Sequence, residues 1–211
     1  MSCQLKVVDL TCLPPAEEIL GAKESAFFQT LRFPKRRTEW LGGRFALKEL
    51  VRQATGADKK EIEILPQPSG KPLLRVGENP CPLAFSITHS HGFAAAALSA
   101  EDAFVGIDLE KVAHRIEAWA KDFFHPSELT GEGDNFLTAL WTQKEALVKV
   151  LGTGLSLNSY DVRCVNGRAE FYGPALAAYE KLGRPALEMK TWELVPGFMF
   201  TQACGKISPV I

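Results

Sequence analysis

The sequence predicts an α+β chain made of two pseudo-symmetric halves, and three observations support this prediction. Two segments, 39–51 and 139–151, have helical spacing, and each carries a tryptophan with charged residues four and eight positions later. Each segment is followed by a strand-like stretch, "EIEILP" or "SYDVRCV". Each half then ends in an apolar strand after a turn, "HGFAAAALS" or "PGFMFTQAC". We therefore expect an N-terminal subdomain at 1–104, a C-terminal subdomain at 105–211, and a ligand cleft between them.

The two predicted helices can be aligned as an internal repeat. The aligned pairs are Trp40 with Trp141, Arg44 with Glu145, and Lys48 with Lys149. Two halves of about a hundred residues each would explain such a repeat.

An acidic strand is expected at 105–112, "VGIDLEKV". Side chains alternate along a strand, so Asp108 and Glu110 point to one side while Ile107 and Leu109 point to the other. Two carboxylates therefore share one face.

The second helix supplies two more charged side chains. Leu140, Leu147 and Leu151 form its apolar stripe, and a glycine-rich turn after residue 151 ends it. Glu145 and Lys149 are i,i+4 neighbours on an adjacent face. Taken alone, such a pair is more often a surface ion pair worth a few tenths of a kcal/mol than part of a site.

Composition excludes several classes of protein. The 211 residues are 46% hydrophobic, and 24 basic residues balance 25 acidic ones, so a general nucleic-acid binder is not expected. Five scattered cysteines without a Cys-x-x-Cys pair indicate neither a disulfide framework nor a zinc site. No window approaches the roughly 18 apolar residues of a membrane span, and the start of the chain lacks the pattern of a signal peptide. We expect a cytoplasmic protein without a membrane partner.

Four motifs occur in order along the chain: "GKP" at 70–72, "FSITHS" at 85–90, "GIDLEKV" at 106–112, and "WTQKEALVKVLGTGL" from 141. With these motifs the sequence resembles a 4'-phosphopantetheinyl transferase of the two-lobed, surfactin-synthetase-activating class. The resemblance spans about residues 33–160. It implies that the phosphopantetheine arm of coenzyme A is moved to a serine of an apo-carrier protein, with release of adenosine 3',5'-bisphosphate.

The resemblance also implies a metal site. Asp108, Glu110 and Glu145 match the three acidic metal positions of the family, and oxygen donors alone favour Mg²⁺ or Mn²⁺ over Zn²⁺. Glu145 would also accept the serine proton, directly or through a metal-bound water. Lys149 corresponds to the lysine that stabilises charge on the pyrophosphate. Lys144 matches another family position, and a structural salt bridge is as consistent with it as a substrate contact.

Coenzyme A itself would be held by residues of the first half. By resemblance, Lys71 and Pro72 meet the adenine end and His89 meets a phosphate, while Thr88 keeps the hydroxyl of a family serine. In isolation, His89 would be a core imidazole and "SGKP" a simple turn. A basic stretch from residue 35 adds arginines for the 3'-phosphate, because guanidinium groups suit a terminal phosphate. Arg44 is the firmest of these, and either Arg36 or Arg37 turns inward beside it.

Two alternatives remain open at this point. One is another Mg²⁺-dependent hydrolase or transferase acting on a nucleotide diphosphate, although no Walker loop supports a triphosphatase. The other is a non-catalytic protein that binds coenzyme A or a carrier. A monomer is expected, because an internal duplication would supply an interface within one chain.

Overall fold

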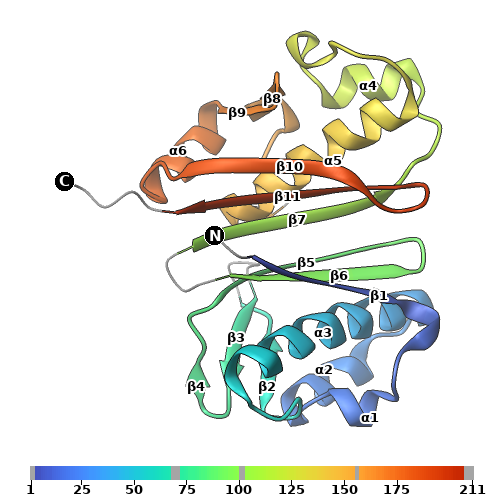
Figure 1. Ribbon diagram of the computed structural model, residues 1–211, viewed down its shortest axis with the longest axis vertical. Helices are drawn as coiled ribbons and strands as arrows, with labels where there is room; N and C mark the ends of the chain where they lie inside the picture. Colours follow the sequence, from blue (N-terminus) through green and yellow to red (C-terminus); the bar gives the residue numbers. More distant parts are fainter. Residues whose placement is uncertain (1–2, 68–71, 100–102, 155–156, 207–211) are drawn as a thin grey trace. The chain divides into compact units, whose positions relative to one another are not determined.

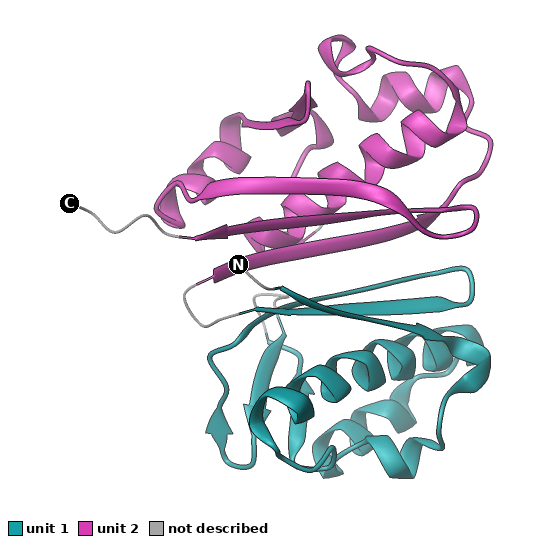
Figure 2. Cartoon of the chain, in the orientation of Figure 1, with its two compact units in different colours: residues 1–101 teal, residues 102–211 magenta. Residues whose placement is uncertain are grey.

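The computed structural model describes residues 3–67, 72–99, 103–154 and 157–206. Contacts divide the chain into two compact units, residues 1–101 and residues 102–211, which Figure 2 shows in different colours. Both units contain helices and antiparallel sheets, so the predicted α+β class is confirmed (Figure 1).

The division between the units differs slightly from the predicted boundary. That boundary, after residue 104, falls inside the strand β7 (Ala103–Lys111). Because this strand runs unbroken to the acidic residues, its first two residues belong with the second unit. Within the described ranges, no helix is long and apolar enough to cross a membrane.

Unit 1 packs a long helix, α3, on a three-stranded antiparallel sheet with the order β1-β6-β5. A second small sheet has the order β2-β3-β4. The elements in chain order are β1 (Gln4–Asp9), α1 (Ala16–Ile19), α2 (Ala22–Thr30), α3 (Pro34–Thr55), β2 (Ile62–Leu65), β3 (Leu73–Val76), β4 (Asn79–Pro80), β5 (Ala84–Ser90) and β6 (Phe93–Ser99).

Unit 2 packs the helix α5 on a three-stranded antiparallel sheet with the order β10-β11-β7. A two-stranded sheet, β8-β9, lies beside the same helix in Figure 1. After β7 the elements are α4 (Glu117–Phe123), α5 (Gly133–Leu151), β8 (Val162–Val165), β9 (Arg168–Phe171), α6 (Gly173–Lys181), β10 (Ala186–Val195) and β11 (Phe198–Lys206).

The two units share one topology. In each, the first strand pairs with the last strand, and the last strand pairs with the one before it. In each, the long helix is followed by a small antiparallel hairpin, β2-β3 or β8-β9. The pseudo-symmetry that the sequence predicts is therefore present in the connectivity.

A buried lysine–glutamate pair repeats in both units and fixes the correct alignment of the repeat. In unit 1, the Lys48 ammonium pairs with Glu24 and donates hydrogen bonds to the carbonyl oxygens of Ile19 (2.8 Å) and Lys59 (2.9 Å). Glu24 in turn accepts a bond from the backbone N–H of Ile64 in β2 (3.0 Å). The pair ties α1, α2 and β2 to the long helix.

Lys144 makes the same set of contacts in unit 2. Its ammonium lies 2.8 Å from Glu128 and donates to the carbonyl oxygens of Phe123 and Ser159, both at 2.8 Å. Glu128 accepts a bond from the backbone N–H of Cys164 in β8 (2.9 Å). Lys144, and not Lys149, is therefore the counterpart of the unit 1 lysine, and the alignment proposed from the tryptophans was wrong.

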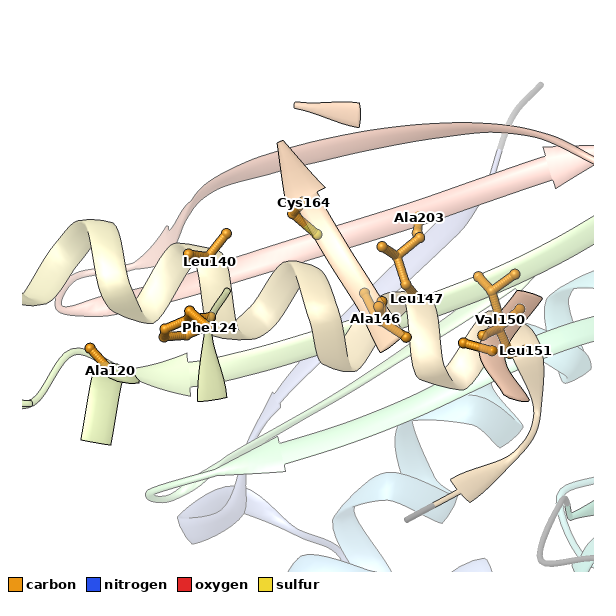
Figure 3. Packing of buried hydrophobic residues seen from close by; sticks show 11 residues of the cluster. Ala120, Phe124, Leu140, Ala146, Leu147, Val150, Leu151, Cys164 and Ala203 are labelled. Carbon is orange, nitrogen blue, oxygen red and sulfur yellow. The ribbon is translucent and has the colours of Figure 1, made fainter. Parts of the chain in front are cut away.

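The helix α5 forms as the sequence predicts. It ends at Gly152, whose φ of 68° lies in the left-handed region that glycine adopts without strain. Leu140, Leu147 and Leu151 are buried in the core of unit 2, with Phe124 and Val150 (Figure 3). This stripe packs in a core with buried residues of α4, β8 and α6. Lys149, on another face of α5, contacts β7.

A glycine on the acidic strand allows this helix to lie unusually close to the sheet. A Cβ atom at Gly106 would stand 2.0 Å from the Ala146 carbonyl oxygen and 2.9 Å from the Val150 nitrogen of α5. Neither backbone atom can move without shifting the helix. Gly106 shares its strand face with Asp108 and Glu110, so that face is turned toward α5.

We expect the substitution Gly106→Ala to lower the free energy of unfolding by about 3 kcal/mol or more, because the added methyl meets helix backbone. Gly43→Ala is the comparison variant and should lose less stability, because its Cβ would meet a side-chain atom, the Ile87 Cγ2 atom at 2.6 Å, and not helix backbone. Urea denaturation of both variants checks this. Equal losses in the two variants would contradict the proposed close contact.

Candidate active site

The acidic strand presents its two carboxylates to α5. Asp108 is 5% exposed, whereas Glu110 is half-buried nearer the end of β7. The predicted sharing of one strand face by these two side chains follows from the alternation in β7. Buried carboxylates need compensating charge or hydrogen bonds, so the partners that α5 supplies determine what this face can do.

Lys149 provides that compensation. Its ammonium lies 2.8 Å from the Asp108 Oδ1 atom and donates to the carbonyl oxygen of Ile107, also at 2.8 Å. The ion pair that the structure places here therefore joins α5 to β7, and Lys149 is not simply the surface partner of Glu145. These two contacts hold the Lys149 ammonium in place, where it can also interact with the anionic group of a ligand.

Glu145 lies in the field of both strand carboxylates. Burial raises the pKa of Glu145 above its usual value, and the negative charges of Asp108 and Glu110 raise it further, while Lys149 opposes the rise. Three acids and one lysine thus influence one another across the α5–β7 contact.

The three carboxylates suit a hard divalent cation by their chemistry, since all donors are oxygens and no cysteine or histidine joins them. Their side chains are not arranged as a ready-made metal cluster: among the described residues, no group of three or more histidine, cysteine, aspartate or glutamate side chains is so arranged. The metal site remains a prediction.

A cavity of about 320 Å³ lies beside Glu145. Phe123 and Trp141 line one part of it, and Asn158 and Ser159 line another. It belongs wholly to unit 2. Lys144 also lines the cavity, and its ammonium forms a buried ion pair with Glu128. Of the two roles that the sequence left open for Lys144, these contacts show the structural salt bridge.

In unit 1, a second polar cluster forms where α3 meets β5. The guanidinium of Arg36 lies 3.2 Å from His89 Nε2, and the Nδ1 atom of the same ring lies 3.7 Å from Glu39. The His89 side chain is 33% exposed, so it is not a core imidazole. A partly exposed histidine beside an arginine is suited to contact an anion.

Arg44 lies two turns further along α3 and is more deeply buried. Its guanidinium stacks 3.9 Å above the Trp40 ring, and within the described part of the chain its buried Nε atom has no hydrogen-bond partner. Burial lowers the pKa of Arg44 to about 10, the charge of Glu24 opposes this, and the neighbouring charge of Arg36 lowers it further. Two cations that repel each other and an unpaired donor favour the binding of an anion here.

Arg37 is directed elsewhere. It donates hydrogen bonds to the carbonyl oxygens of Phe28 (2.8 Å) and Leu31 (3.1 Å), and it stacks on the Phe28 ring. The sequence left open which of Arg36 and Arg37 turns toward the predicted phosphate site. In the structure Arg36 contacts His89, whereas Arg37 does not take part in this cluster. Arg37 fastens α2 to α3.

The remaining predicted contacts in unit 1 do not join this cluster. The side chain of Ile87 faces α3, where its Cγ2 atom lies close to Gly43, so His89 shares that face and the buried Thr88 points to the other side of β5. Pro72 is half-buried and precedes β3, while Lys71 lies outside the described residues. Their contacts with coenzyme A stay predictions.

Sequence reasoning missed Gly106 and the Lys48–Glu24 pair, and it named no partner for the salt bridge that it left open at Lys144. A glycine inside a strand pattern is a usable signal for close backbone approach, and "VGIDLE" contains it. The pairs had no such signal, because Glu24 and Glu128 lie at different sequence distances from Lys48 and Lys144.

Comparisons with known proteins identify the family of the chain. The family described as the 4'-phosphopantetheinyl transferase superfamily matches residues 104–180, which include Asp108 and the whole of α5. A holo-[acyl-carrier-protein] synthase of Geobacillus sp. is 36% identical over 91 residues, which cover 40% of this chain and 76% of that protein. The chain belongs to the 4'-phosphopantetheinyl transferase superfamily.

Two further relatives extend the family likeness beyond the second unit. A putative 4'-phosphopantetheinyl transferase of Synechocystis sp. is 30% identical over 158 residues, 70% of this chain and 63% of that protein. The 4'-phosphopantetheinyl transferase Sfp of Bacillus subtilis is 28% identical over 167 residues, 74% of this chain and 69% of that protein. The chain thus spans less than two thirds of the length of the Synechocystis relative.

Substitutions of Arg44 and Arg37 should differ in their effect on stability. Arg44→Met should leave the free energy of unfolding within about 1 kcal/mol of the wild type, because it removes a partly buried charge whose Nε atom makes no hydrogen bond to the described residues. Arg37→Met should cost about 1–3 kcal/mol, because it leaves two carbonyl oxygens without their donor. Thermal and urea unfolding measure both. A larger loss at Arg44 would show that this arginine supports the fold.

Proposed function

We propose that this protein transfers the 4'-phosphopantetheine arm of coenzyme A to a serine of an apo-carrier protein. The observation that carries the proposal is the meeting of Asp108, Glu145 and Lys149 across the α5–β7 contact in a member of this superfamily. In the reaction, the serine oxygen forms a bond to the β-phosphorus of coenzyme A. The bond from that phosphorus to the bridging oxygen breaks, and adenosine 3',5'-bisphosphate leaves.

The residues of unit 2 would serve the reacting atoms. Glu145 would take the proton from the serine, directly or through a water. Lys149 would stabilise the negative charge that builds on the leaving phosphate. Its present contact with Asp108 keeps the ammonium at the site.

Asp108, Glu110 and Glu145 would hold Mg²⁺, with Mn²⁺ as the alternative. The ion would supply charge neutralisation for the pyrophosphate. The support for this assignment is the all-oxygen donor set and the influence that the three acids exert on one another.

The residues of unit 1 would bind the nucleotide end of coenzyme A. Arg36, Arg44 and His89 would contact phosphate, with the 3'-phosphate nearest to Arg44, because that guanidinium is buried with a donor unpaired. Lys71 and Pro72 would meet the adenine, and Thr88 would offer its hydroxyl.

The two-lobed, surfactin-synthetase-activating class is the finer assignment that we propose. The repeated topology within one chain supports it, and so does the likeness to the Sfp protein, which extends over more of the chain than unit 2 alone. A duplicated chain of this kind would act as a monomer. The expected absence of a nucleic-acid or membrane partner and the cytoplasmic location stay predictions.

The test is to incubate the protein with coenzyme A, Mg²⁺ and an apo-carrier, and to look for the phosphopantetheine adduct by intact mass spectrometry. Adduct formation that EDTA abolishes and added Mg²⁺ restores would support the proposal. Consumption of coenzyme A without modified carrier would favour a hydrolase instead. Binding of coenzyme A without any turnover, for a panel of carriers, would favour a non-catalytic binding protein.

We expect Glu145→Gln to lower kcat by at least about 100-fold, because it removes a proton acceptor and a candidate metal ligand. Its unfolding midpoint should not fall, since the change relieves repulsion between Glu145 and the two strand carboxylates. Glu132→Gln, at the exposed start of α5, is the matched control and should keep its activity. The role of Glu145 is refuted by a variant that transfers at the wild-type rate.

A second kinetic prediction concerns the 3'-phosphate. The wild type should prefer coenzyme A over dephospho-coenzyme A, and Arg44→Met should remove about 1.5–3 kcal/mol of that preference, or about tenfold or more in kcat/KM. Arg37→Met should keep the preference, because its guanidinium is engaged with α2. Rates with both substrates provide the measurement, and an unchanged ratio in Arg44→Met would reject the assignment.

A further inference from the structure

The cavity beside Glu145 has two walls that come from separate segments. Asp122 and Phe123, at the end of α4, form part of one wall, and Asn158 and Ser159, before β8, form part of the other. At about 320 Å³ the cavity has the size of a small ligand pocket. Its shape therefore depends on how these two segments are held relative to α5.

One ammonium group holds both walls. Lys144 Nζ donates to the carbonyl oxygen of Phe123 on one wall and to that of Ser159 on the other, both at 2.8 Å. Ser159 Oγ also donates to the Phe123 carbonyl (2.9 Å), so the two walls meet at the same point. The Lys144 side chain is 2% exposed and cannot exchange these contacts for water.

Glu128 keeps this ammonium in place. It pairs with Lys144 at 2.8 Å and is itself fixed by the backbone N–H groups of His125 (2.8 Å) and Cys164 (2.9 Å). All three contacts are buried or partly buried, where electrostatic interactions are stronger than in water. The pair therefore holds the two walls together at this point with little freedom.

The lining of the cavity indicates what it takes. Apolar surface comes from Phe123, Trp141, Val148, Leu157 and Val162, and the carboxylates of Asp122 and Glu145 also line the cavity, which disfavours an anion. An uncharged, partly apolar portion of a substrate fits such a lining better than a phosphate does. Because the cavity adjoins Glu145, that portion would lie next to the reacting phosphoryl group.

We propose that Lys144 and Glu128 are positioning residues for the transfer. Through the carbonyl groups of Phe123 and Ser159 they fix the cavity walls, and thereby the fit of the uncharged portion of a transfer substrate beside Glu145. This inference rests on the proposed function. Neither residue touches the reacting atoms, so their loss acts on substrate binding more than on the chemical step.

The chain provides its own control, because Lys48 and Glu24 form the same kind of buried pair in unit 1. A single substitution would leave one buried charge without its partner and could prevent folding. The test variants are therefore the doubles, Lys144→Met with Glu128→Gln and Lys48→Met with Glu24→Gln. Circular dichroism and unfolding curves establish that both doubles are folded and comparably destabilised.

The experiment measures KM for coenzyme A, KM for the carrier and the inhibition constant of adenosine 3',5'-bisphosphate, which contains only the nucleotide end. In the unit 2 double, KM for one substrate should rise by about fivefold or more while the inhibition constant and kcat change by less than about twofold. In the unit 1 double, two quantities should stay as in the wild type. One is KM for the carrier, and the other is KM for coenzyme A divided by the inhibition constant.

A rise in KM for coenzyme A places the pantetheine arm in the cavity, whereas a rise in KM for the carrier places a carrier side chain there. Either result supports the positioning role. The role is overturned if both doubles change all constants alike, or if the unit 2 double loses only kcat. A wild type that forms no adduct would instead overturn the proposed function, and this inference with it.

Discussion

The backbone of α5 lies directly on β7 because residue 106 has no side chain, and the rest of the candidate site depends on this contact. With a methyl group at that position the Ala146 carbonyl oxygen would be only 2.0 Å away. The close approach brings Lys149 within hydrogen-bond distance of Asp108 and places Glu145 in the field of the strand carboxylates. A helix held a few ångströms further from the sheet would leave these charges separated by solvent, where their influence on one another is weak.

The same contact explains why the charges of unit 2 are tolerated in a partly buried place. Asp108 is compensated by Lys149, and burial shifts Glu145 toward its neutral form. Unit 1 contains the complementary arrangement, in which Arg36 and Arg44 repel each other and the buried Nε atom of Arg44 has no hydrogen-bond partner among the residues that the structure describes. One unit thus holds acids close together and the other holds cations close together. Each arrangement is suited to a ligand of the opposite charge.

Sequence patterns predicted the secondary structure and the charged face well, because both follow from local periodicity. The alternation in "VGIDLEKV" and the spacing of Leu140, Leu147 and Leu151 are properties of single elements. The direction of Arg37 was not predictable, because it depends on the carbonyl groups of Phe28 and Leu31 at the end of α2. The alignment of the two halves failed for a similar reason: tryptophans can be matched in sequence, but the equivalent lysines are identified only by the carbonyl groups that they contact.

The buried lysine–glutamate pairs have a consequence for how this sequence can change over time. Replacing either partner alone strands a charge in the interior at a cost of about 3–5 kcal/mol, whereas replacing both with apolar residues is often neutral. Drift at these positions must therefore occur in two coordinated steps, the first of which is disfavoured. Among divergent homologues, Lys48 should be retained or lost together with Glu24, and Lys144 together with Glu128. The two positions of each pair should therefore covary.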